Sequence, residues 1–177
     1  MKNNNLKTKC CNAATQCRGK VKALKILDIE FLYLDLSVCT RCQASENNLE
    51  EALAEVAAVL KAAGYKVRLR KVNVNSRELA EKYKFISSPT IRINGRDVAL
   101  TLKETACKEC GDLCGDDVNC RVWFYEGKEY TEPPKAMLVN AILTEVYAPS
   151  LSASVYEQKY IVPKNLEDFF SGMQSEK

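Results

Sequence analysis

The segment Ser37-Val38-Cys39-Thr40-Arg41-Cys42-Gln43 lies at the point where one apolar pattern of the chain gives way to another. Before it, residues 24–36 alternate in a way that is typical of a buried strand. After it, leucine and valine recur at helical spacing, and Gly64 follows as a helix stop. Thr40 and Gln43 have the spacing of a capping box, which predicts that the helix begins at Thr40. The sequence therefore predicts a strand that leads into a helix, with both cysteines of this segment at the turn.

The rest of the chain continues to alternate strand and helix patterns. Residues 65–74 predict a second strand, and the slip in phase before Val72 predicts a bulge in it. A short helix is expected next, followed by a hairpin with Asn94-Gly95 as its type I′ turn. Residues 101–119 have the composition of a Cys-rich loop, after which a further hairpin and a helix opened by Pro133-Pro134 are expected. We therefore expect an α/β fold with a mixed sheet flanked by helices.

The composition excludes several classes of protein. A chain of 177 residues with 46% hydrophobic residues is long enough for one domain with a core. It has nine cysteines and no histidine, so a metal site must use thiolates, carboxylates or backbone groups. A net charge of +3 is too small to indicate a nucleic-acid partner, and no apolar segment predicts a membrane span or a signal peptide. We expect a cytoplasmic monomer with reduced or redox-active thiols.

Charge and composition divide the chain into three parts. Every charged residue before Asp28 is a lysine or an arginine, and this basic bias marks an appendage. The predicted parts are an N-terminal arm at residues 1–20 that contains Cys10, Cys11 and Cys17, a domain at residues 21–148 with a Cys-rich insertion at residues 101–120, and a C-terminal tail at residues 149–177. The tail is expected to contain one short helix that docks through Leu166, Phe169 and Phe170.

A cysteine at the first turn of a helix is chemically activated. Unpaired N–H groups and the positive end of the helix dipole stabilise a thiolate at Cys39, and Arg41 adds a nearby cation. Cys42 follows three residues later and is within reach as a resolving thiol. We predict that Cys39 attacks a disulfide and that Cys42 resolves the mixed disulfide. Two buried structural cysteines, or half of a zinc knuckle, are the structural alternative.

The order of these elements resembles that of the thioredoxin and glutaredoxin family. The resemblance covers residues 24–100 and the helix after Pro134, and it depends on the Cys39–Cys42 motif and on Ser88-Pro89-Thr90. It implies a thioredoxin-like sheet in which Pro89 is a cis proline packed against the two cysteines. It also implies that Ser88 offers its backbone to an extended substrate, and that the protein is a thiol–disulfide oxidoreductase acting on a protein or small-molecule disulfide without a cofactor.

This chain departs from that family in two places. Thr40-Arg41 is neither of the dipeptides typical of thioredoxins and glutaredoxins, and Tyr33 stands where thioredoxins bury an acidic residue. The whole chain is also similar to a prokaryotic group of thioredoxin-like proteins that carry a Cys-rich insertion. Some members of that group have selenocysteine in place of an active-site cysteine.

The insertion contains a second set of cysteines with the spacing C-x2-C-x3-C-x5-C. Its members are Cys107, Cys110, Cys114 and Cys120. Glycine follows the second and third of them and permits the tight turns that metal knuckles need. Three interpretations fit this spacing: a four-thiolate zinc loop, two disulfides or a disulfide relay, and a trap for a soft metal.

Strand reversals predict where this second set lies. In a thioredoxin-like sheet the hairpin at Asn94-Gly95 returns the chain to the end that carries Cys39. Residues from 101 onward should therefore begin near Cys39, which would allow thiol exchange between the two sets or a shared thiolate site. The alternative function is then a non-catalytic carrier of a soft metal or metalloid such as Zn(II), Cu(I), Hg(II) or As(III).

Overall fold

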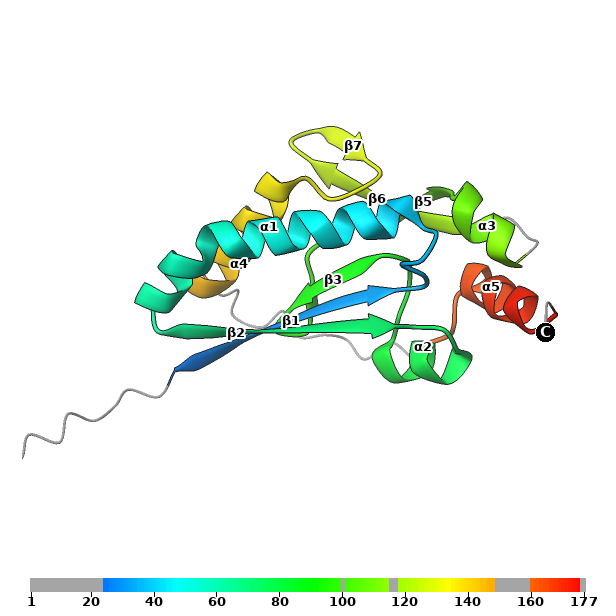
Figure 1. The fold of residues 1–177 in the computed structure, drawn as a ribbon, viewed down its shortest axis with the longest axis horizontal. Helices are drawn as coiled ribbons and strands as arrows, with labels where there is room; N and C mark the ends of the chain where they lie inside the picture. Colours follow the sequence, from blue (N-terminus) through cyan, green and yellow to red (C-terminus); the bar gives the residue numbers. More distant parts are fainter. Residues whose placement is uncertain (1–23, 100, 115–117, 149–159, 176–177) are drawn as a thin grey trace, which may run out of the picture.

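The computed structural model describes residues 24–99, 101–114, 118–148 and 160–175 and has an α/β architecture (Figure 1). The predicted N-terminal arm with its three cysteines lies outside these residues. The elements, in chain order, are β1 (Lys25–Tyr33), α1 (Thr40–Ala62), β2 (Tyr65–Asn73), α2 (Arg77–Tyr83), β3 (Thr90–Ile93), β4 (Arg96–Asp97), β5 (Lys103–Ala106), α3 (Lys108–Cys114), β6 (Asn119–Tyr125), β7 (Lys128–Tyr130), α4 (Lys135–Tyr147) and α5 (Lys164–Ser175). None of the described helices is both long and apolar enough to cross a membrane.

The larger sheet is mixed, as predicted. Its strand order is β2-β1-β3-β4, in which β1 pairs parallel with β2 and antiparallel with β3. The parallel strands β1 and β2 are joined by α1, which returns the chain to the end of the sheet at which β1 begins. At the hairpin between β3 and β4, Asn94 and Gly95 have φ angles of 50° and 80°, which confirms the predicted turn with two positive φ values.

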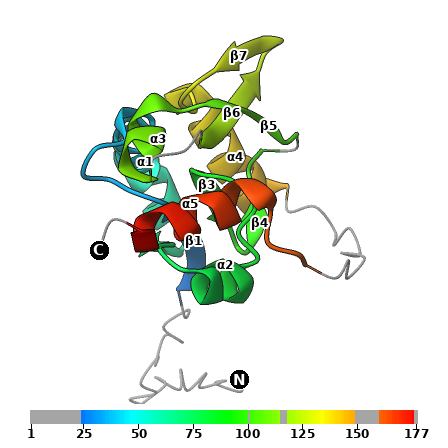
Figure 2. The ribbon, with the colours of Figure 1, turned by 90° about the vertical axis from the view of Figure 1, so that its right-hand side faces the viewer.

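Helices cover both faces of this sheet (Figures 1 and 2). On one face, Leu27, Ile29 and Phe31 alternate along β1 and pack in a buried cluster with residues of α1 and α4. On the other face, Leu32 and Leu34 join a second buried cluster that includes residues of α2, the insertion and α5. The α/β fold with a mixed sheet flanked by helices is therefore confirmed.

The predicted bulge in the second strand is wrong. The pairing of β1 with β2 is unbroken from Lys25 opposite Tyr65 to the ends of both strands. The alternation of apolar and charged residues along β2 changes before Val72 because different elements cover the two faces of this strand. Lys71 is on the face toward α1, where it forms ion pairs with two of that helix's glutamates, whereas Val72 packs in the cluster on the opposite face.

The predicted loop at residues 101–119 contains regular structure. Lys103–Ala106 forms β5, which pairs antiparallel with β6, and Lys108–Cys114 forms α3. The glycines and aspartates of this segment favour turns, but pairing with β6 stabilises an extended backbone that local composition does not reveal. A three-stranded sheet of order β5-β6-β7 results.

The tail helix docks on the insertion. Leu166, Phe169 and Phe170 of α5 are buried, as predicted, and they share a core cluster with Cys107 and Cys110. Figure 1 shows that the start of α1, together with α3 and α5, gathers beyond the end of the larger sheet where β1 and β2 finish. Three segments that are far apart in the sequence therefore meet at this end.

Candidate metal centre

The first cysteine of the Cys39–Cys42 motif caps α1. Cys39 is the N-cap residue, and its sulfur accepts the backbone N–H of Cys42 at 3.4 Å. The predicted capping box is therefore wrong, because Gln43 donates from Nε2 to the carbonyl of Leu36 and Thr40 bonds outward to the insertion. As a consequence, the Cys39 sulfur is fixed at the positive end of the helix rather than in solvent.

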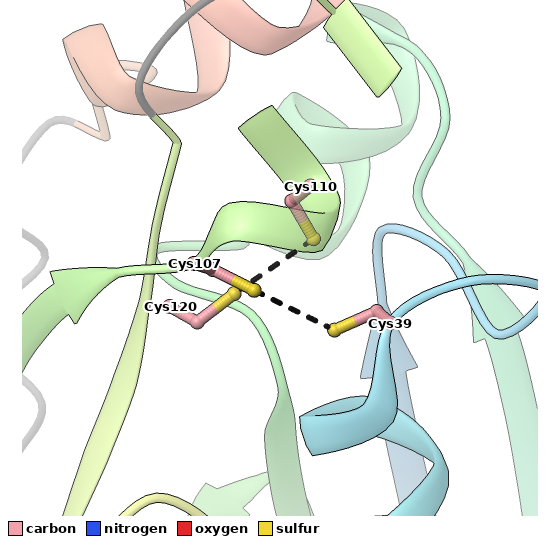
Figure 3. Close-up of side chains that lie close together, drawn as sticks. All are labelled: Cys39, Cys107, Cys110 and Cys120. Carbon is pink, nitrogen blue, oxygen red and sulfur yellow. Dashed lines mark hydrogen bonds between the residues drawn. The ribbon is translucent and has the colours of Figure 1, made fainter. Parts of the chain in front are cut away.

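The insertion brings three further cysteines to this point. Cys107 directly precedes α3 and Cys110 lies in its first turn, so the three-residue step places both on one side of the helix. Cys120 lies on β6, opposite Thr105 of β5. Figure 3 shows the side chains of these three cysteines and of Cys39 converging from three elements.

The four sulfurs are as close as metal ligands must be. The Cys39 and Cys107 sulfurs are 3.9 Å apart, as are those of Cys110 and Cys120, and all four lie within 4.8 Å of one another. In a tetrahedral zinc site with Zn–S bonds of about 2.3 Å, adjacent sulfurs are separated by about 3.8 Å. All four residues are buried, with at most 2% of their surface exposed. These cysteines could therefore bind a metal ion.

The sulfurs of this cluster are farther apart than a disulfide bond. A disulfide requires sulfurs about 2.05 Å apart, and the structure shows Cys39, Cys42, Cys107, Cys110 and Cys120 as free cysteines. The prediction that the loop cysteines lie close to Cys39 is confirmed for Cys107, Cys110 and Cys120, while thiol exchange between the two sets and a shared thiolate site both stay predictions. The side chain of Cys114 lies outside the described part of the chain, so its predicted role as a ligand stays a prediction.

The cluster divides into two groups with opposite pKa shifts. Hydrogen bonds from the thiols of Cys107, Cys110 and Cys120 lower the pKa of Cys39. Hydrogen bonds from Cys110 and Cys120 also lower the pKa of Cys107. The pKa values of Cys110 and Cys120 are raised, chiefly because their thiols hydrogen-bond to Cys107. The site therefore favours thiolates at Cys39 and Cys107 and neutral thiols at the other two positions.

Cys42 has a different environment. Its buried sulfur lies 3.4 Å from Oγ of Ser88, which also accepts the backbone N–H of Leu34. Its pKa is raised, first by the hydrogen bond to Cys39 and then by burial. The Ser88–Pro89 peptide bond is cis, as predicted, and Pro89 is buried. The side chain of Cys42 thus contacts the loop before β3 and is not part of the group of four sulfurs.

The insertion is held over Cys39 by polar contacts from three sides. Nη1 and Nη2 of Arg41 donate to Oγ1 of Thr105 at 2.9 Å and to the carbonyl of Ala106 at 3.0 Å. Oγ1 of Thr40 donates to Glu109 of α3 at 2.8 Å. Sequence patterns predicted Arg41 only as a nearby cation. No pattern in the sequence indicates its contact with the insertion, because Thr105 and Ala106 lie 64 and 65 residues further along the chain.

The third contact corrects an expectation about Ser88. Its carbonyl accepts the backbone N–H of Arg121 in β6 at 2.7 Å. The carbonyl is therefore bonded to the chain's own strand β6 and is not open to an extended substrate. Because Cys39 is also fully buried, a protein disulfide could reach it only after the insertion moved away from α1.

Comparisons with known proteins identify one family. No curated protein and no solved structure matches the chain. A family model described as Domain of unknown function (DUF2703) matches residues 27–142, which include the four clustered cysteines, Cys42 and Pro89. The match covers more than half of the chain, and the chain therefore belongs to the DUF2703 family.

Proposed function

We propose that this protein binds one soft metal ion, with Zn(II) the first candidate, through Cys39, Cys107, Cys110 and Cys120. The observation that carries this proposal is the convergence of four buried sulfurs within 4.8 Å. Thiolates select soft ions, and four of them complete a tetrahedral shell. Such a closed shell has no open position for a substrate, so the ion would be held or delivered rather than used for hydrolysis.

Charge supports the presence of a cation at this position. Cys39 and Cys107 are buried, their lowered pKa values favour thiolates, and a buried anion without a partner is strongly unfavourable. The guanidinium of Arg41 is directed to β5 by its bonds to Thr105 and Ala106. A divalent ion would compensate the charge of the thiolates and favour deprotonation of the remaining two.

Metal analysis of two matched variants tests this proposal. Reduced wild-type protein should bind one Zn(II) or Co(II) per chain, and the Co(II) form should show the absorption of tetrahedral thiolate coordination. Cys39→Ser should lose most of this binding. Cys42→Ser is the matched control, because Cys42 is equally buried in the same helical turn but is not in the cluster, and it should bind normally. Equal binding by the Cys39→Ser and wild-type proteins would contradict the proposed ligand set.

A further variant distinguishes this set from a site made by the insertion alone. The spacing of the sequence also allows Cys114 as the fourth ligand, with Cys39 left out. If the proposed set is right, Cys114→Ser retains one ion per chain and Cys120→Ser does not. The reverse dependence, on Cys114 but not on Cys39, would favour the insertion-only site.

A second candidate is thiol–disulfide exchange by the metal-free protein. It is favoured by the position of Cys39 at the N-terminus of α1, with Cys42 one turn later beside the cis Ser88–Pro89 bond. The mixed sheet, in which β1 pairs parallel with β2 and antiparallel with β3, also fits the mixed sheet that the resemblance to thioredoxins implies. In this function Cys39 attacks the substrate disulfide and Cys42 resolves the mixed disulfide.

Insulin reduction by chelator-treated protein tests this second function. Wild type should catalyse the reaction, Cys39→Ser should be inactive, and Cys42→Ser should accumulate a mixed disulfide at Cys39. Equal activity of the wild-type and Cys39→Ser proteins would exclude Cys39 as the nucleophile. A metal carrier need not catalyse repeated turnovers, so this assay separates the two functions.

A further inference from the structure

We propose that Cys42 is a release thiol for the metal site: a disulfide between Cys39 and Cys42 removes Cys39 as a ligand and frees the ion. This inference rests on the proposed metal site and concerns its regulation. It starts from the position of Cys39, which belongs to two groups at once. Its sulfur is 3.9 Å from that of Cys107 on the insertion and accepts the N–H of Cys42 on its own helix.

The geometry of the helix makes the two roles of Cys39 mutually exclusive. Residues three apart at the start of a helix have Cα atoms about 5 Å apart, which lies within the range that a disulfide spans. A sulfur in such a bond is no longer a thiolate and cannot ligate an ion in the same way. Cys42 is therefore placed to compete with the metal for Cys39.

Cys42 also has no other use in the proposed site. It is fully buried, lies outside the group of four sulfurs, and has only the hydroxyl of Ser88 and Cys39 as polar partners of its side chain among the contacts described. Serine or alanine would fill this position without a thiol that can be oxidised. A buried thiol beside a metal ligand is explained if its sulfur reacts with that ligand.

The reaction balances with a small disulfide, such as oxidised glutathione, as the oxidant. The Cys39 thiolate attacks one sulfur of the oxidant, which forms a mixed disulfide and expels one thiolate. Cys42 loses its proton to solvent and attacks the Cys39 sulfur, which expels the second thiolate and leaves the Cys39–Cys42 disulfide. The protein loses two electrons, the oxidant gains them, and the ion leaves as an unreduced cation.

Loss of Cys39 as a ligand disconnects the start of α1 from the three ligands of the insertion. The remaining ligands Cys107, Cys110 and Cys120 all belong to the insertion, so Cys39 is the one ligand of the cluster that comes from α1. The contact between Thr40 and Glu109 at this edge is a hydrogen bond of exposed side chains, and such contacts open more easily than an apolar core. An oxidant can therefore reach Cys39 when this edge opens.

A zinc-release assay in glutathione redox buffers tests this inference. Zinc-loaded wild type and Cys42→Ser are equilibrated at a series of oxidised-to-reduced glutathione ratios, and released zinc is measured with a chromogenic chelator. Wild type should release one zinc per chain as a Cys39–Cys42 disulfide appears in peptide maps. Cys42→Ser can form only an intermolecular mixed disulfide, so its release should require a ratio at least about tenfold higher. Cys42→Ala, which removes the hydroxyl as well, should behave as Cys42→Ser does.

Each outcome has one meaning. If reduced wild type binds no zinc, the proposed metal site fails, and the release function fails with it. If wild type binds zinc but releases it at the same glutathione ratio as Cys42→Ser, or through a disulfide within the insertion, the release role of Cys42 is wrong and the metal site stands. If oxidation produces the Cys39–Cys42 disulfide while zinc stays bound, the two roles of Cys39 are not exclusive and the inference is also overturned.

Discussion

A single side chain, Cys39, connects the local chemistry of the helix to the cluster. Its sulfur accepts an N–H from the first turn of α1 and lies among three thiols of the insertion. Both surroundings stabilise the thiolate, and the hydrogen bonds from the other cysteines are the larger influence on its pKa. A residue that sequence patterns identify as a nucleophile is for the same reason a good metal ligand, since both roles need a thiolate.

The pKa shifts predict how metal binding depends on pH. Cys39 and Cys107 have lowered pKa values, which favours their thiolate forms, whereas Cys110 and Cys120 have raised values and must each lose a proton when the ion binds. Binding near neutral pH should therefore release at least two protons but fewer than four, and zinc affinity should rise at least about 100-fold per pH unit. Calorimetry in buffers of different ionisation enthalpy measures this number.

Cys42→Ser supplies the control for the proton count. Because Cys42 is not in the cluster, this variant should release the same number of protons as wild type. Release of four protons would show that none of the ligands is a thiolate in the metal-free protein. Release of none would show that zinc does not displace protons from Cys110 and Cys120.

At the scale of elements, the insertion acts as a cover over the start of α1. The strands β5 and β6 and the helix α3 form one unit, since β5 pairs with β6 and α3 lies between them in the chain. Arg41 ties this unit to α1 through two residues of β5 that immediately precede Cys107. The length of chain between the bonds of Arg41 and the first insertion ligand is therefore short, and Arg41 fixes where that ligand lies.

Replacing Arg41 should loosen the cover. Arg41→Met removes the bonds to Thr105 and Ala106, and we expect a loss of about 1–3 kcal/mol in the free energy of unfolding. Zinc should also dissociate faster, which stopped-flow transfer to a chelator would detect. Arg68→Met is the control, because Arg68 forms an ion pair with Asp28 near the start of β1, at the other end of that strand from the cysteines, and its zinc dissociation rate should be that of wild type. If zinc dissociated from Arg41→Met and from the control variant at the same rate, Arg41 would have no role in holding the metal site.

At the scale of the molecule, the C-terminal helix completes the core around the site. Phe169 and Leu166 of α5 are at most 1% exposed and belong to the same buried core cluster as all five cysteines whose side chains the structure describes. Figure 2 shows α5 crossing in front of the sheet, next to α3 and above α2. The site therefore depends on a segment that begins more than forty residues after its last ligand, Cys120.

Truncation of a docking side chain should show this dependence. Phe169→Ala creates a cavity in the shared cluster and should reduce the free energy of unfolding by about 3–5 kcal/mol, measured by chemical denaturation. The exposed Ile161, at 75% exposure, provides the control, and Ile161→Ala should change stability little. Zinc should restore part of the stability of Phe169→Ala, because an ion that binds only the folded state stabilises it. If the α5 contact supports the site, zinc should stabilise Phe169→Ala less than wild type at the same zinc concentration, and equal stabilisation of the two proteins would show that the site and the α5 contact are independent.

Local sequence determined the elements that have a local cause. The alternation along β1, the helical spacing in α1 and the positive φ values at Asn94 and Gly95 follow from side-chain period and from the turn that those residues permit. The docking face of α5 was predicted in the same way. The cap of α1 and the slip in β2 were predicted wrongly, because Cys39 and Thr40 bond to the insertion and the two faces of β2 pack against different elements.

The tertiary structure alone decided which cysteines meet. The sequence spacing grouped Cys107, Cys110, Cys114 and Cys120 as neighbours in the chain, and it identified Cys39 with Cys42. The strand reversals predicted that the two groups lie close together, but spacing carries no information about which sulfurs point inward. That choice follows from the pairing of β5 with β6, the bond from Arg121 to Ser88 and the packing of α3 on α5, which together direct three insertion thiols onto Cys39 and leave Cys42 beside Ser88.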